Sequence, residues 1–136
     1  MSKTVRIICF VLSLVCLAAI AYLSLAKDVS VPEYIYGKDK GAHFLAYMAL
    51  GFLLFMCFHN SVYHRIIVSN LLPVFGAGSL SFLCGYTIEL CQPYFNRSFE
   101  AGDLVADGLG SLAGAVIGLV CVFFMCFIEK RRRHRR

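Results

Sequence analysis

Residues 104–128 read LVADGLGSLAGAVIGLVCVFFMCFI and contain one charged side chain, that of Asp107. A helix that crosses the hydrocarbon core of a bilayer needs about 20 predominantly apolar residues, so this segment predicts a transmembrane helix. Three further apolar runs, at residues 5–26, 41–58 and 66–91, satisfy the same criterion. The pattern therefore predicts an all-α, polytopic membrane protein built as a bundle of four transmembrane helices.

The composition of the whole chain agrees with a membrane environment. Of its 136 residues, 60% are hydrophobic and 15% are charged, and the mean hydropathy is +0.75. Soluble domains average roughly 45–50% apolar and about 25% charged residues, so this composition excludes a soluble domain and also a disordered chain. The segments between the runs are short, so residues 1–136 are expected to form one domain with its functional groups in or beside the bundle.

Two of the runs contain features that complicate a simple helix. Lys3 and Arg6 flank the first run, and Ser24 and Ala26 resemble the small residues of a signal-peptide cleavage site. Its apolar part exceeds the roughly 7–15 residues of a typical signal peptide, which favours an uncleaved helix. The third run contains Pro73, which predicts a kinked crossing.

The distribution of charge predicts the orientation of the helices. Residues 129–136 carry six lysines and arginines directly after the fourth run, and the positive-inside rule assigns such a cluster to the cytoplasm. Four crossings place both termini on that side, together with nine of the thirteen lysines and arginines, and leave seven of the eight acids at the outer end. Next to a membrane helix, the basic tail is expected to bind anionic lipid and not nucleic acid.

Polar side chains recur at helical spacing where the second run begins. Asp39, His43 and Tyr47 are four residues apart. Lys40 precedes His43 by three residues, so all four side chains share one face of a helix over two turns. Lipid would favour apolar residues on that face, so we expect it to be turned toward the other helices.

Two further helix ends carry polar groups at the same predicted level. Glu89 and Gln92 lie three residues apart at the end of the third run, and Arg97 follows in the next loop. Asp103 and Asp107 lie four residues apart at the start of the fourth run. Three helix ends are therefore expected to bring these groups together at the outer edge of the membrane.

Helix capping explains only part of this pattern. Asp39 and Asp103 stand where an acid at a helix N-terminus satisfies free amide groups. Capping requires neither an imidazole nor a guanidinium, so the combination favours a shared site. Asp107 begins a stripe of small residues, with glycines at 110, 114 and 118, whose spacing lets a neighbouring helix approach closely. The polar end of that stripe is expected to point into the bundle.

In this order, the polar residues resemble the signatures of the VanZ-like membrane proteins, a family named for a bacterial teicoplanin-resistance protein. The first signature, Asp-Lys followed by His and Tyr, is matched by Asp39, Lys40, His43 and Tyr47. The second is matched by Glu89, Gln92, Arg97, Asp103, Asp107, Gly110 and Gly114. The family usually has Asn where this chain has Asp107, and residues 93–96 differ from the Pro-Gly turn that commonly precedes the arginine.

The resemblance implies a protein of the bacterial cytoplasmic membrane that modifies or binds lipid head groups, or lipid-linked cell-wall precursors, at the outer face and affects sensitivity to glycopeptides. Its expected partners are membrane lipids, such a precursor or a glycopeptide. The expected catalytic residues are His43, Glu89, Asp39, Asp103 and Asp107. The expected substrate-binding residues are Lys40, Tyr47, Gln92 and Arg97.

The side chains are suited to chemistry on a phosphodiester. Lys40 and Arg97 are expected to hold the phosphate, Arg97 through its two-pronged donor geometry. His43 is suited to act as a nucleophile or as a general base, with Asp39 or Glu89 fixing its tautomer.

Three alternatives stay open at this point. Glu89, Asp103 and Asp107 are also suited to bind a divalent cation that neutralises the phosphate. A non-catalytic protein would bind or shield the same head groups, or a lipoglycopeptide, without turnover. A proton-coupled transporter would use the acids and His43 as a relay, although four helices without a repeat leave little room for alternating access.

Overall fold

The computed structural model describes residues 3–26, 38–59 and 66–134. These residues form the helices α1 (Lys3–Leu25), α2 (Lys38–Phe58), α3 (Ile66–Cys91) and α4 (Ala101–His134), with a 3-10 helix, η3 (Gln92–Phe95), directly after α3. The described part of the chain contains no strand, and all four α-helices are long and apolar enough to cross a membrane. The predicted all-α architecture with four transmembrane helices is confirmed.

α1, α2 and α4 are longer than the predicted apolar runs, whereas α3 has the predicted bounds. α1, α2 and α4 each begin two or three residues earlier, because helical backbone continues through polar residues that contribute little hydropathy. α4 also continues past the predicted end at Ile128, and Arg133 donates a hydrogen bond to Glu129 in this extension (2.6 Å). Pro73 lies inside α3, which is assigned as one continuous helix.

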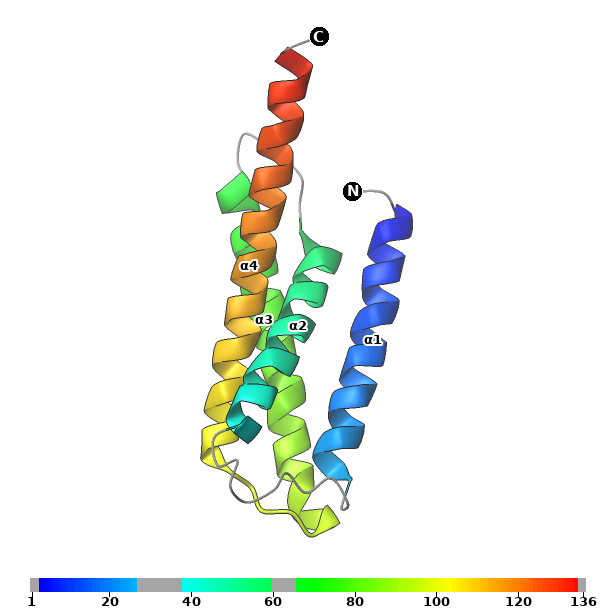
Figure 1. Cartoon of the computed structure of the whole chain (residues 1–136), viewed down its shortest axis with the longest axis vertical. Helices are drawn as coiled ribbons and strands as arrows, with labels where there is room; N and C mark the ends of the chain where they lie inside the picture. Colours follow the sequence, from blue (N-terminus) through cyan, green and yellow to red (C-terminus); the bar gives the residue numbers. More distant parts are fainter. Residues whose placement is uncertain (1–2, 27–37, 60–65, 135–136) are drawn as a thin grey trace.

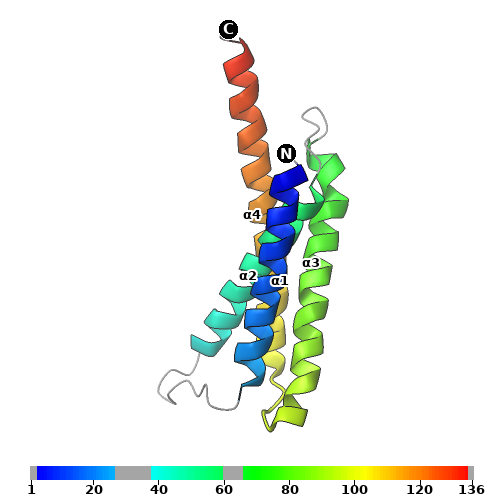
Figure 2. The same cartoon turned by 90° about the vertical axis from the view of Figure 1, so that its right-hand side faces the viewer.

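The four α-helices lie side by side along the long axis of the molecule (Figure 1). α1 begins and α4 ends at the same end of the bundle, as four crossings require, and α4 projects beyond the other helices there (Figures 1 and 2). We call this the terminal end. The opposite end, which we call the site end, is formed by the end of α1, the start of α2, η3 and the start of α4.

α2 and α4 form the closest helix pair, and glycine makes their contact possible. A Cβ on Gly110 would collide with the backbone carbonyl of Phe44, and a Cβ on Gly114 would collide with that of Met48. From the other side, Gly51 of α2 leaves room for the carbonyl of Ser111. The stripe of small residues therefore allows two backbones to meet, as its spacing predicted.

The bundle has an apolar core, and its buried carboxylates, those of Glu89, Asp103 and Asp107, lie toward the site end. Tyr47, Leu50, Phe55 and Val122 are among the fully buried side chains. Many large apolar side chains of all four helices point outward instead. In a bilayer, these outward residues contact lipid chains and are not a defect of packing.

Candidate functional site

A buried carboxylate of α4 holds the imidazole of His43. His43 Nδ1 lies 2.9 Å from Oδ1 of Asp107, whose side chain is completely buried. His43 Nε2 lies 4.0 Å from Oδ2 of Asp103. When Nδ1 carries the ring proton, it donates a hydrogen bond to Asp107, and the lone pair of the neutral imidazole is then on Nε2. The side chain of His43 is 11% exposed, so the pair lies just beneath the surface.

A second buried carboxylate, that of Glu89, comes from the end of α3. Gln92 Nε2 donates a hydrogen bond to Oε1 of Glu89 (2.7 Å), and the backbone N–H of Glu100 lies 3.5 Å from its Oε2. Gln92 is the first residue of η3, so its amide reaches back to Glu89 just after α3 ends. These two donors fix the orientation of the carboxylate.

Three helices thus contribute to one cluster. One ligand atom each from His43 of α2, Glu89 of α3 and Asp107 of α4 lie within 4.8 Å of one another. We call these three residues the polar cluster. Asp103 and Asp107 are both buried, which confirms that the polar end of the α4 stripe points into the bundle.

Lys40 lies at the rim of the polar cluster. Its Nζ donates hydrogen bonds to Oε2 of Glu100 (3.0 Å) and to Oδ1 of Asp103 (3.1 Å). The side chain of Lys40 is 42% exposed, whereas that of Asp103 is 6% exposed. A Cβ on Gly102 would lie 2.7 Å from Nζ, so the glycine leaves room for the ammonium group.

Tyr47 lies one turn deeper than His43 on the same face of α2. Its ring is fully buried and stacks against the His43 ring, with centroids 6.3 Å apart. The hydroxyl of Tyr47 and Oδ2 of Asp107 are buried and have no hydrogen-bond partner among the described residues. A Cβ on Gly85 would lie 2.7 Å from that Asp107 oxygen and 3.0 Å from Tyr47 Cζ, the carbon that bears the hydroxyl.

Below Tyr47, two serines connect the same three helices. Ser111 of α4 donates a hydrogen bond to Ser81 of α3 (2.8 Å), and Ser81 Oγ lies 3.4 Å from the backbone carbonyl oxygen of Tyr47. Both serines are buried. This polar layer fixes the relative heights of α2, α3 and α4 beneath the polar cluster.

Arg97, which was expected to bind substrate, contacts backbone carbonyls of α1 in the structure. Its Nη1 lies 3.4 Å from the carbonyl oxygens of Leu23 and Ala26 at the end of α1. A cation at a helix C-terminus satisfies free carbonyls and interacts favourably with the helix dipole. The guanidinium forms no ion pair with the carboxylates that the structure describes. The side chain of Asp39 lies outside the described part of the structure.

The sequence matches VanZ/LLP1 over residues 3–125, which is most of the chain. The protein belongs to the VanZ/LLP1 family. No curated protein and no solved structure gives a significant match. The matched range contains the whole polar cluster of this VanZ/LLP1 protein, and also Lys40, Tyr47 and Arg97.

The structure of this VanZ/LLP1 chain gives His43 a partner that helical spacing did not predict. Asp39, whose side chain lies outside the described part of the structure, or Glu89 was expected to orient the imidazole, and Asp107 contacts His43 Nδ1. Spacing within a helix shows which residues share a face but not which residue of another helix meets that face. The pairing therefore depends on the register of α2 against α4, which the packed glycines set.

The sequence prediction also missed Glu100 as a site residue. Glu100 pairs with Lys40 through its side chain and approaches Glu89 through its backbone N–H. Its position between η3 and α4, outside any apolar run, gave no periodic signal. The only hint was an excess of acids at this end of the chain.

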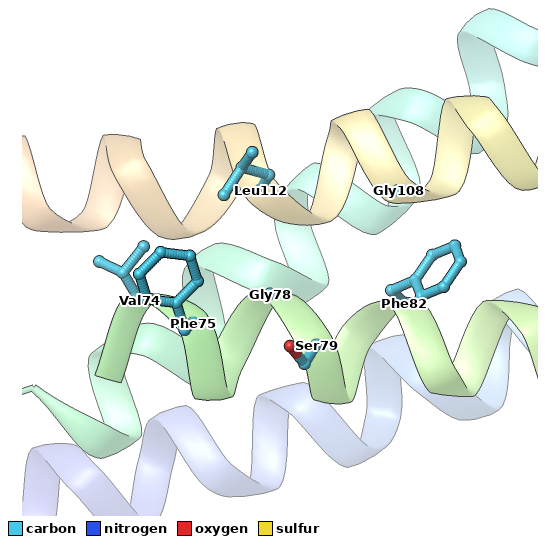
Figure 3. A pocket seen from close by; sticks show the side chains of 7 residues that line it. All are labelled: Val74, Phe75, Gly78, Ser79, Phe82, Gly108 and Leu112. Carbon is cyan, nitrogen blue, oxygen red and sulfur yellow. The ribbon is translucent and has the colours of Figure 1, made fainter. Parts of the chain in front are cut away.

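A separate apolar groove of about 260 Å³ lies between α3 and α4. Figure 3 shows Val74, Phe75 and Phe82 of α3 opposite Leu112 of α4. Its other lining residues are Gly78, Ser79 and Gly108. No residue of the polar cluster lines this groove, so the two features are distinct.

Proposed function

We propose that this protein acts on the phosphodiester head groups of envelope lipids, or of lipid-linked cell-wall precursors, at one surface of the membrane. The observation that carries the proposal is the His43–Asp107 pair, with its 2.9 Å contact and its buried carboxylate, next to the second buried acid Glu89. Several structural roles need one polar residue at a helix end. None of them needs an imidazole and two buried acids from three helices.

The depth of the polar cluster supports a head-group substrate. The membrane-spanning part of α2 begins at Lys40 and that of α4 at Ala101. At 1.5 Å per residue, His43 is about 5 Å and Asp107 about 9 Å from these starting points. The polar head-group layer is roughly 5–7 Å thick on each side of the hydrocarbon core. The cluster thus lies at or just below the level of lipid phosphates.

Charge supports an outward orientation of the site end in the bacterial cytoplasmic membrane. Basic residues dominate the described part of the terminal end, which carries Lys3, Arg6, Lys130, Arg131, Arg132 and Arg133. Acids outnumber cations at the site end. The positive-inside rule therefore directs the site end away from the cytoplasm. The name of the VanZ family refers to teicoplanin resistance, which favours a substrate in the cell envelope.

Phosphodiester exchange or hydrolysis is the reaction that these side chains support. His43 Nε2 removes the proton from a water or alcohol hydroxyl, and the hydroxyl oxygen attacks phosphorus. The bond between phosphorus and the departing alcohol breaks, and the imidazolium returns its proton to that alcohol oxygen. Asp107 stabilises the imidazolium through Nδ1 and keeps the ring in one orientation.

Lys40 is the cation nearest to the surface of the site. Its Nζ lies between the exposed Glu100 and the buried Asp103. A phosphate that enters from the surface would displace Glu100, the more exposed partner, and leave the contact with Asp103 in place. Lys40 then neutralises the phosphate, while Arg97 holds the end of α1 against the loop before α4.

The test compares lipid extracts from cells that lack the protein, contain it, or contain one of two variants. His43→Gln removes the ring of the site, and His59→Gln is its matched control, since His59 is a buried histidine at the other end of α2. Mass spectrometry should detect altered head groups with the wild-type and His59→Gln proteins, but not with His43→Gln at equal membrane levels.

Identical lipid profiles in all four samples would contradict the proposal. If glycopeptide sensitivity nevertheless changed with the wild-type protein, a non-catalytic shielding role would replace it. That result would also assign Lys40 and the polar cluster to binding without turnover.

A further inference from the structure

We propose that the polar cluster binds a first-row divalent metal ion, Zn²⁺ or Mn²⁺, with His43, Glu89 and Asp107 as its protein ligands. The inference rests on the proposed function only for the chemical use of the ion. Binding itself is measured without any lipid reaction.

The geometry of the polar cluster fits one ion. A metal ion bound at about 2.0–2.2 Å to each ligand separates its ligand atoms by roughly 3–4 Å. The ligand atoms of the polar cluster already lie within 4.8 Å of one another, so small side-chain rotations suffice. One imidazole nitrogen with carboxylate oxygens is a ligand set that suits Zn²⁺ and Mn²⁺. Three protein ligands leave a coordination position for water or a phosphate oxygen.

Two unpartnered oxygens at this point are an independent indication of a ligand. Buried polar atoms almost always have a hydrogen-bond partner. In the part of the chain that the structure describes, Asp107 Oδ2 and the Tyr47 hydroxyl have none, although both residues are completely buried. Both groups approach the space that Gly85 leaves open. A bound ion would be a partner for Asp107 Oδ2, and a water on the ion would be a partner for the hydroxyl.

The balance of charge also favours a cation. Lys40 pairs with Glu100 and Asp103. No lysine or arginine among the described residues pairs with Glu89 or Asp107. Two acids buried within the bundle are costly unless a positive charge compensates them. One divalent ion compensates both acids.

Glu89 is already oriented as a metal ligand would be. The Gln92 amide and the Glu100 backbone N–H hold its two oxygens. Such outer contacts commonly fix the orientation of a ligating carboxylate. When the ion is bound, His43 is a ligand and not a base, so the head-group reaction would then depend on the ion.

The test uses the full chain in lipid nanodiscs, stripped with a chelator and titrated separately with Zn²⁺ and Mn²⁺. Bound metal is measured by mass spectrometry after gel filtration. The wild-type protein should bind about one ion per chain, and Glu89→Gln and Asp107→Asn should bind about tenfold more weakly or worse. Glu129→Gln is the matched control, because it removes an exposed carboxylate at the terminal end of α4, and it should bind like wild type.

A second measurement protects the test against misfolded variants. Electron paramagnetic resonance of bound Mn²⁺ should show coupling to a nitrogen of His43 in the wild-type protein, and this coupling should be absent in His43→Gln. The proposal is overturned if the stripped wild-type protein binds no more metal than Glu89→Gln, or if all variants bind equally.

The metal-binding test and the lipid test of the proposed function can fail independently of each other. Metal binding with unchanged lipid profiles would refute the head-group reaction alone. Lipid turnover by stripped protein that binds no metal would refute the metal site alone, and it would assign the reaction to the imidazole.

Discussion

The two ends of α2 carry two histidines in nearly the same local setting but with different partners. His43 stacks on Tyr47, four residues later, and His59 stacks on Phe55, four residues earlier, with ring centroids 6.3 and 5.9 Å apart. His43 Nδ1 meets a buried carboxylate of another helix. His59 Nδ1 lies 3.0 Å from a backbone carbonyl oxygen of its own helix, that of Met56.

The difference shows that burial and aromatic stacking do not by themselves make a histidine functional. His59 is 2% exposed, and burial lowers the pKa of its imidazole below the ordinary value. A neutral ring that bonds to the backbone at a helix end has a structural role. The His43 ring instead faces acids that can stabilise its charged form or share a metal ion with it.

The largest expected effect follows from removing the partner of His43. Asp107→Ala leaves Nδ1 without its carboxylate, so head-group turnover in proteoliposomes should fall about 100-fold or more. Glu129→Ala is the control, because it removes an exposed carboxylate from the other end of α4, and its rate should be unchanged. Equal turnover rates for Asp107→Ala and Glu129→Ala would show that the carboxylate at the site end of α4 contributes no more to turnover than the carboxylate at the terminal end.

A second prediction concerns the glycines that bring α2 and α4 together. Gly114→Ala places a methyl group against the backbone of Met48, and overpacking of this kind should cost about 2–3 kcal/mol of unfolding free energy. Gly76→Ala has no neighbour within 4 Å and should be neutral or stabilising by up to about 1 kcal/mol. Titration with SDS in mixed micelles measures both. Equal stabilities would show that close backbone contact does not hold the site in register.

A third prediction tests the rim of the site. Lys40→Met should raise the KM for the phosphodiester about tenfold, since one charge contact to phosphate is lost. The unfolding free energy should change only modestly, because ion pairs of half-exposed lysines contribute little. Lys3→Met, at the terminal end, should change neither quantity. A large loss of stability in Lys40→Met would show that Lys40 has a structural role and would contradict this prediction.

The smallest expected effect concerns His59 and pH. Because its pKa is lowered in the folded state, the unfolded chain takes up a proton more readily as the pH falls from about 7 to about 5. Folding is therefore slightly less stable at the lower pH. His59→Gln should lose this component of the pH dependence in thermal unfolding. An unchanged pH profile would show that His59 is not buried in its neutral form.

Much of the fold follows from hydropathy, whereas the partners within the site do not. Apolar runs and the bilayer thickness are enough to locate four helices, and the glycines after Asp107 correctly indicate close packing. Helical spacing also places His43 and Tyr47 on one buried face.

The partners within the site depend on contacts between helices, and the spacing of residues along one helix does not predict these contacts. The pairing of His43 with Asp107 requires the register of α2 against α4. The contacts of Arg97 with the carbonyls at the end of α1 likewise join segments far apart in the sequence, and its role in binding substrate stays a prediction. The predicted apolar run also underestimates the length of α4, because the charged extension of this helix is helical without being apolar.

The most direct test of the central claim is phosphorus NMR of proteoliposomes that contain one defined phospholipid and equal amounts of purified wild-type, His43→Gln or His59→Gln protein, with an alcohol as acceptor. The account predicts a new phosphorus resonance with the wild-type and His59→Gln proteins and none with His43→Gln. A resonance of equal intensity with His43→Gln, or no new resonance with any of the three across the phospholipids of the envelope, would contradict it.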